Sequence, residues 1–90
     1  MSTYARIFSN FLDASTDRDN YVYHHKADVA SINDKQGKVE MRNGDYIYWI
    51  VMRSEQDRIK ISGMEFKDVE IFGVDPQLIP FIKSRVRGDY

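Results

Sequence analysis

The dipeptide Asn43-Gly44 and the apolar run after it constrain the fold more than any other feature of this sequence. Asn and Gly both tolerate the positive φ angles of a tight hairpin, so the pair is the strongest short signal for a turn between antiparallel strands. The run Tyr46–Met52 is apolar at every position, which is typical of a strand buried on both faces. We therefore place Tyr46–Met52 at the centre of a sheet, with Val39 and Met41 in the strand before the turn.

The chain before this hairpin divides into segments of different periodicity. Apolar side chains recur with helical spacing over Tyr4–Leu12, so we predict an amphipathic first helix whose buried stripe includes Leu12. The polar run Asp13–Asn20 favours turns and caps, and it ends that helix. Alternation then predicts a strand over Tyr21–Ile32, followed by a turn at 33–37.

The chain after Met52 shows signals for two helices and one strand. Ser54–Asp57 has the form of a capping box, and Gly63 would end the short helix that it starts. Alternation around Val69–Ile71 predicts a fourth strand. Asp75-Pro76 is typical of the start of a helix. Pro80 would remove a helical hydrogen bond, so either a separate turn precedes it or the last helix begins near it.

These elements predict a single α+β domain spanning residues 1–90. We expect a four-stranded mainly antiparallel sheet with an N-terminal and a C-terminal helix packed against it. The helix between the third and fourth strands would allow those two strands to run parallel through a right-handed crossover. With 42% hydrophobic and 30% charged residues, the composition is that of an ordinary globular chain with one core.

Charge and cysteine content exclude several function classes. The 13 Lys and Arg residues nearly balance the 14 Asp and Glu residues, so bulk charge indicates neither a strongly basic nucleic-acid binder nor an acidic mimic of DNA. The chain has 0 Cys, which excludes disulfides, thiol catalysis and cysteine-based zinc sites. Because no apolar run resembles a signal peptide or could span a bilayer, we expect a cytoplasmic protein with no membrane partner.

Residues 38–75 carry a pattern that resembles a known family. The stretches from Val39 to Ile47 and from Ile61 to Phe72, with a charged helix between them, are similar to the middle of the ATPase core of phage terminase large subunits. That core has a strand, an Asn-Gly-Ser turn, a second strand and an element leading into the acidic Walker B strand end. Gly73-Val74 stands where the acids should follow, and the chain has no G-x-x-x-x-G-K-[ST] loop. The resemblance therefore implies a phage-type accessory protein and argues against an ATPase.

Tyrosines interleaved with basic residues form the first candidate binding surface. Tyr side chains that alternate along strands beside Lys and Arg could stack on bases, as in single-strand binders. The alternative is that Tyr serves here as a strand former with a solvated hydroxyl. The residues concerned are Tyr21, Tyr23, Lys26, Arg42, Tyr46, Tyr48 and Arg53.

Two further groups of residues are candidates for function. Lys83, Arg85 and Arg87 lie near the end of the last predicted helix, where they either complement the helix dipole or contact phosphate. His24 and His25 would point to opposite faces of a predicted strand, so they cannot bind one metal together. We therefore expect neither a metal nor a cofactor.

The missing catalytic patterns, the small size and the phage resemblance lead to one preferred function. We expect a non-enzymatic accessory or inhibitor protein that docks on a host macromolecule, such as a defence factor. The alternative is a single-stranded RNA or DNA binder, and an enzyme built on His24 or His25 ranks last. We also predict a homodimer, with Tyr21 and Tyr23 at the contact, because Tyr21–Ile32 is a candidate edge strand and a chain of this size has little stability to spare.

Overall fold

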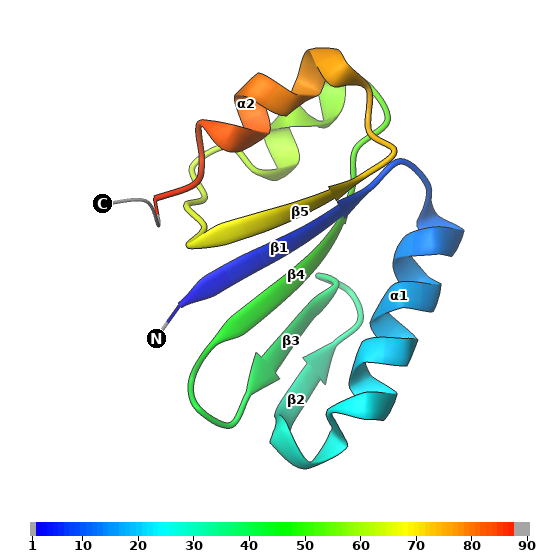
Figure 1. Cartoon of the computed structure of the whole chain (residues 1–90), viewed down its shortest axis with the longest axis vertical. Coiled ribbons are helices and arrows are strands. Elements are labelled where there is room, and N and C mark those ends of the chain that lie inside the picture. Colours follow the sequence, from blue (N-terminus) through cyan, green and yellow to red (C-terminus); the bar gives the residue numbers. More distant parts are fainter. Residues whose placement is uncertain (1, 88–90) are drawn as a thin grey trace.

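A computed structural model describes residues 2–87 as a five-stranded mixed sheet with helices on both faces (Figure 1). The strand order is β2-β3-β4-β1-β5, with β1 parallel to both β4 and β5 and with antiparallel pairs at β2/β3 and β3/β4. The main elements are β1 (Thr3–Phe8), α1 (Phe11–His24), β2 (Val29–Asn33), β3 (Lys38–Met41), β4 (Tyr46–Val51), β5 (Asp68–Phe72) and α2 (Ile79–Lys83). Three 3-10 turns join them, namely η1 (Lys26–Asp28), η2 (Glu55–Lys60) and η3 (Pro76–Leu78).

The sheet separates two apolar cores. On one face α1 covers β3, β4 and β1, and buried Ala14 of α1 packs with Val39, Ile47 and Trp49. The other face carries the larger core, which the segment around η2 and the elements η3 and α2 cover (Figure 1). Its members are Ala5, Ile7, Ile50, Met52, Ile61, Phe66, Val74, Leu78 and Ile82. The class α+β is confirmed, but the prediction of four mainly antiparallel strands is wrong in detail.

The largest correction concerns β1, which replaces the predicted first helix. Residues Thr3–Phe8 form the strand between β4 and β5, so the strand is buried from both sides and its apolar side chains need not follow one face. Ala5 and Ile7 point into the larger core, while Phe8 packs on the α1 side. Spacing over such a short run fits a helical stripe and a buried strand equally well. The pairing of Thr3–Phe8 with both β4 and β5 decides in favour of the strand.

The polar run predicted as a turn lies inside α1. Asn10 caps this helix, since its side-chain oxygen accepts the backbone N–H of Asp13 at 2.8 Å. Only Ala14 of α1 is buried, whereas Leu12 is 73% exposed. The helix therefore shows almost no apolar periodicity, and its sequence does not distinguish it from a loop. The predicted strand Tyr21–Ile32 begins as the end of α1, and its last residues, from Val29 on, form β2. β2 does lie at an edge of the sheet.

Local signals in the second half of the chain are confirmed. β3 and the central position of β4 are as predicted, and a turn does join them at Asn43-Gly44. The turn is looser than predicted, because residues 42–45 form it and Gly44 has a positive φ of 93° whereas Asn43 does not. The carboxylate of Asp57 accepts the backbone N–H groups of Arg53 at 2.6 Å and of Ser54 at 3.3 Å. The bond from the Arg53 backbone is the main reason that the pKa of Asp57 is lowered. Pro80 follows a separate turn, η3, and lies in the first turn of α2, where no helical hydrogen bond is lost.

No helix in residues 2–87 is both long enough and apolar enough to cross a membrane.

Two aspartate substitutions test the corrected start of the chain. Ile7→Asp puts a carboxylate at a position that is 0% exposed, which should cost several kcal/mol, roughly the whole stability of a domain of this size. Leu12→Asp adds an acid to an exposed site in the first turn of α1, where the helix dipole favours it. Its free energy of unfolding should change by no more than about 0.5 kcal/mol in urea titrations. If Leu12→Asp unfolds the domain instead, Leu12 is buried and the amphipathic first helix predicted from the sequence is correct.

Candidate functional site

The pairing of β1 with β5 places charged and aromatic side chains side by side on the α1 face of the sheet. Tyr4 is in register with Asp68, and Arg6 is in register with Glu70. Because neighbouring residues of a strand point to opposite faces, the alternation in both strands puts all four side chains on one face. α1 lies mainly over β4 and β1, so it leaves the β5 side of this face open (Figure 1).

Asp17 of α1 joins the helix to this face through three hydrogen bonds. Its carboxylate accepts hydrogen bonds from Nε of Arg6 at 2.6 Å, from a second guanidinium nitrogen of Arg6 at 3.2 Å, and from Nε1 of Trp49 at 2.7 Å. Arg6 also lies 3.4 Å from Glu70. Bidentate pairs between Arg and a carboxylate are among the strongest polar contacts in proteins. Asp17 therefore sets both the position of α1 and the direction of the Arg6 side chain.

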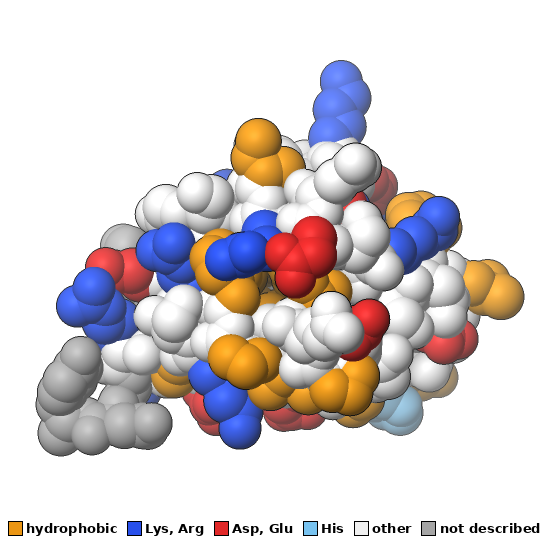
Figure 2. All heavy atoms as spheres, turned by 90° about the horizontal axis from the view of Figure 1, so that it is seen from above, with side chains coloured by type: hydrophobic (Ala, Val, Ile, Leu, Met, Phe, Trp, Pro, Cys, Tyr) orange, Lys and Arg blue, Asp and Glu red, His pale blue; other side chains and the backbone are white. Residues whose placement is uncertain are grey.

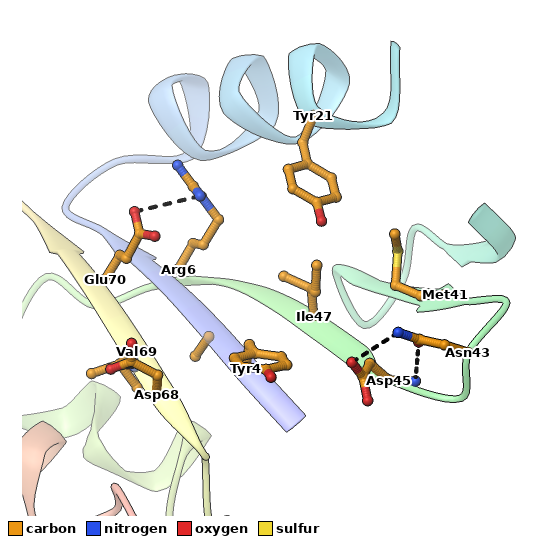
Figure 3. A pocket seen from close by; sticks show the side chains of 11 residues that line it. Tyr4, Arg6, Tyr21, Met41, Asn43, Asp45, Ile47, Asp68, Val69 and Glu70 are labelled. Carbon is orange, nitrogen blue, oxygen red and sulfur yellow. Dashed lines mark hydrogen bonds and ion pairs between the residues drawn. The ribbon is translucent and has the colours of Figure 1, made fainter. Parts of the chain in front are cut away.

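A pocket of about 270 Å³ opens beside this pair, between α1, the paired strands β1 and β5, and the β3–β4 turn. Figure 3 shows the Tyr21 hydroxyl pointing from α1 into the pocket, with Tyr4 lying between Asp68 and Asp45. We call this site the acidic pocket. The side chains that determine its chemistry are Tyr4, Arg6, Tyr21, Asp45, Asp68 and Glu70.

The charge of the acidic pocket is negative. Three carboxylates, those of Asp45, Asp68 and Glu70, line it together with Arg6. Arg6 pairs with Asp17, which does not line the pocket, and with Glu70, so the negative charge of the lining comes mainly from Asp45 and Asp68. Asp45 accepts hydrogen bonds from the backbone N–H of Ser2 at 2.8 Å and from the Asn43 amide at 3.2 Å. These bonds fix the Asp45 carboxylate at the rim.

Tyr21 has a perturbed acidity. Burial raises the pKa of its phenol, Arg6 opposes this effect, and the charges of Asp28 and Asp45 raise the pKa further. The ring packs edge-on against Trp49, with 5.4 Å between centroids, and stacks on His25 at 4.1 Å. The hydroxyl is therefore neutral at physiological pH and is available as a hydrogen-bond donor or acceptor.

The composition of the acidic pocket selects for one class of ligand. Carboxylates beside two phenol rings favour an organic cation, which gains both ionic and cation–π attraction. Phosphate groups would meet like charge. Within residues 2–87 there is no cluster of three or more His, Cys, Asp or Glu side chains arranged to hold a metal ion.

The structure separates the residues predicted to form one Tyr/Arg surface. Tyr21 and Tyr23 lie on α1, where Tyr21 faces Trp49 and Tyr23 is exposed. The prediction that they share a strand face is wrong, because the segment is helical. Tyr46 and Tyr48 do share a face of β4, but it is the face opposite α1. The basic members are also dispersed: Lys26 lies in η1, Arg42 in the β3–β4 turn and Arg53 after β4.

The basic residues at the end of the chain do not form one uniform positive patch. Arg87 pairs with Glu65 at 3.1 Å, and the Arg85 guanidinium lies 5.2 Å from the centroid of the Phe81 ring. Lys83 is the last residue of α2, where it complements the helix dipole. Figure 2 views the molecule from the α2 side and shows basic side chains spread over the surface, with acidic and apolar side chains between them.

The two histidines pack against neighbouring tyrosines. Nδ1 of His25 lies 2.9 Å from the carbonyl oxygen of Tyr21, one helical turn earlier. His24 meets the Tyr23 ring edge-on, with 5.3 Å between centroids. Both histidine rings therefore pack against tyrosines at the end of α1.

Sequence reasoning missed the residues that build the acidic pocket, namely Tyr4, Arg6, Asp17, Asp45, Asp68 and Glu70. Tyr4 and Arg6 were assigned to a helix, so their alternation with Ala5 and Ile7 was not recognised. The sequence does carry a signal for Asp68 and Glu70, since both are acids on the outward face of a predicted strand. Their proximity to Arg6 follows only from the β1/β5 pairing.

Comparisons with protein-family models, with curated proteins and with solved structures find no match to this chain.

Removal of the Asp17 carboxylate should detach α1. In Asp17→Ala, Arg6 and Trp49 each lose a charged acceptor in a site where the Arg6 and Asp17 side chains are 23% and 28% exposed. We expect a loss of about 2–3 kcal/mol in the free energy of unfolding, measured in urea. Asp19→Ala is the matched control, because Asp19 lies on the same helix with its side chain 74% exposed, and it should cost no more than about 0.5 kcal/mol. Equal losses would contradict the role of Asp17.

The acidity of Tyr21 can be measured directly. Its pKa is raised above the ordinary value of about 10, so one tyrosine should titrate late in the ultraviolet absorbance, and Tyr21→Phe should remove that late step. Because the folded state holds the proton more tightly, the associated stability is complete below pH about 10 and is lost as the pH rises through the raised pKa. Asp45→Asn should lower the pKa of Tyr21, since the Asp45 charge contributes to raising it. A late step that survives in Tyr21→Phe would disprove the assignment.

Proposed function

We propose that this chain is a non-enzymatic binding protein that docks on a protein partner through the acidic pocket, with a basic side chain of the partner as the group that enters it. The observation that carries the proposal is the combination in one pocket of two phenol rings with three carboxylates, of which one, that of Glu70, is paired with Arg6. A Lys or Arg side chain would lay its aliphatic stem on Tyr4 and Ile47 and direct its charged end to the carboxylates (Figure 3).

The size of the pocket agrees with a single side chain as the occupant. A volume of about 270 Å³ lies just below the range of about 300–1,000 Å³ typical of small-molecule sites. Partly exposed acids at a rim contribute to specificity and association rate more than to affinity. The rest of the affinity would then come from the surface around the pocket, as in other protein–protein contacts.

The resemblance of residues 38–75 to phage terminase segments supports a phage-type accessory or inhibitor protein with a host protein as its target, such as a defence factor. In the structure these residues form β3, β4, η2 and β5. Ser9 and Asn10 alone join β1 to α1, and this connection is too short for an eight-residue phosphate-binding loop. This geometry supports a role that does not use nucleotide hydrolysis.

Binding of a single-stranded nucleic acid is less well supported. Tyr46 and Tyr48 share a face with Lys38, whose ammonium lies 4.9 Å from the Tyr46 ring centroid, but Tyr21 and Tyr23 are on the other side of the sheet. The face that carries the pocket is acidic and would repel phosphate.

N-acetyl-arginine amide is the probe that tests the pocket, with N-acetyl-citrulline amide as its uncharged analogue. In nitrogen–proton NMR titrations, arginine should shift the amide signals of Tyr4, Val69 and Glu70, and citrulline should shift them far less. Asp68→Asn should weaken arginine binding about three- to fivefold, as expected for one partly exposed ion pair. Asp19→Asn removes the same charge outside the pocket and should have no effect.

The same titration distinguishes the alternatives. Equal shifts with arginine and citrulline, or equal weakening by Asp68→Asn and Asp19→Asn, would refute a cation-specific pocket. If oligothymidylate instead shifts the signals of Tyr46 and Tyr48, with affinity falling steeply as salt is added, the nucleic-acid function replaces the one proposed.

A further inference from the structure

The strand β3 begins too late in the chain to pair with the last residue of β4. The final bond between the two strands runs from the Trp49 N–H to the carbonyl oxygen of Gly37, at 2.8 Å. Gly37 has a positive φ of 64°, and a Cβ on it would lie 2.7 Å from the Trp49 carbonyl oxygen, so only glycine allows this tight approach. Alternate residues of a strand turn their backbone groups to the same neighbour. Val51 therefore faces the gap that β3 leaves beyond Gly37.

The side chain of Lys60 bonds one of the two Val51 backbone groups in this gap. Its Nζ donates to the Val51 carbonyl oxygen at 2.8 Å and lies 3.5 Å from the Asp57 carboxylate. Within residues 2–87, by contrast, nothing accepts the Val51 N–H. An ammonium has three N–H donors, so one donor of Lys60 remains after these two contacts. One amide donor and one ammonium donor thus lie in the same gap without an acceptor there.

A cavity of about 640 Å³ occupies the gap. Phe11 and Ser15 of α1 line it together with Val51, and Lys60 and Met64 come from η2 and the residues after it. The ring of Phe11 is 66% exposed. The volume lies within the range of about 300–1,000 Å³ typical of small-molecule sites. The cavity is distinct from the acidic pocket, since the two share no described lining residue.

The position of the cavity in the sheet also indicates a ligand site. β1 and β4 are adjacent and parallel, and the chain leaves β1 for α1 on one face and β4 for η2 on the other (Figure 1). In open sheets with parallel strands, ligands bind outside the carboxyl ends of the strands, where the connections diverge in this way. The cavity lies at the carboxyl end of β4, which is such a place.

The charge of the cavity lining is positive. Arg18 and Asp34 both line it and pair with each other at 3.4 Å, so together they contribute little net charge. The other charged residues of the lining are Lys35 and Lys60. Asp57, which is outside the lining, offsets part of the charge of Lys60. A small positive charge suits a singly charged anion better than a phosphate dianion.

We propose that this cavity binds a small organic carboxylate with an apolar body. One carboxylate oxygen accepts the Val51 N–H, the other accepts the remaining N–H of Lys60, and the apolar body covers the exposed ring of Phe11 and the side chain of Met64. The two oxygens of a carboxylate match the two unpaired donors in number and in charge. The inference goes beyond the acidic pocket and does not depend on it.

4-Phenylbutyrate is the probe that tests this site, with 4-phenylbutyramide as its uncharged analogue. In nitrogen–proton NMR titrations of the full chain, phenylbutyrate should shift the amide signals of Ser15 and Val51, and the analogue should bind about tenfold more weakly, as expected for loss of a charged hydrogen bond. Lys60→Met removes the ammonium and keeps an unbranched side chain, so it should weaken phenylbutyrate binding by a similar factor. Lys83→Met removes the same charge at the end of α2, outside the cavity, and should have no effect.

Two further measurements separate a lost contact from a lost fold. Circular dichroism shows whether each variant is folded, and Lys60→Arg should keep most of the binding because it keeps the positive charge. If Lys60→Met does not fold, the two ligands compared in the unmodified protein decide alone. Equal affinity for phenylbutyrate and its amide, equal weakening by Lys60→Met and Lys83→Met, or no shift of the Val51 signal at millimolar phenylbutyrate overturns the proposal.

Discussion

The contact of Asp17 with Arg6 and Trp49 is the constraint on which the rest of this structure depends. α1 contributes one fully buried residue, Ala14, to the core, with Tyr21 and Val22 partly buried beside it. The Asp17 carboxylate adds a polar attachment to this packing by accepting hydrogen bonds from β1 and β4 at once. Arg6 in turn reaches Glu70 on β5. A polar network thus links one helix to three neighbouring strands.

The same network determines the chemistry of the open part of the sheet. Because Asp17 and Glu70 neutralise Arg6, the remaining carboxylates give the acidic pocket its negative charge. Tyr21 stands one turn after Asp17 on α1, so the attachment of the helix also aims the Tyr21 hydroxyl into the pocket (Figure 3). The stability of the fold and the proposed binding therefore depend on the same residues, and a change in Asp17 would alter both.

The acids of β5 have two consequences that agree with each other. On the α1 face, Asp68 and Glu70 form the wall of the acidic pocket. At the edge, the same charges oppose pairing with another strand, whereas β2 on the far side of the sheet has no such protection. The chain therefore presents two different surfaces on opposite edges of the sheet. We propose the β5 side, with the acidic pocket, for a basic side chain of a partner.

Local sequence signals by themselves determined the second half of the domain. The Asn43-Gly44 turn, the apolar run of β4 and the Asp57 cap depend on the backbone preferences and hydrogen bonds of residues close in sequence. The first half was decided by tertiary structure, because Thr3–Phe8 fits two periodicities and α1 has almost no apolar stripe. The acidic pocket was likewise beyond the sequence. Arg6, Asp17 and Glu70 are far apart along the chain, and only the parallel pairing of β1 with β5 and the docking of α1 bring them together.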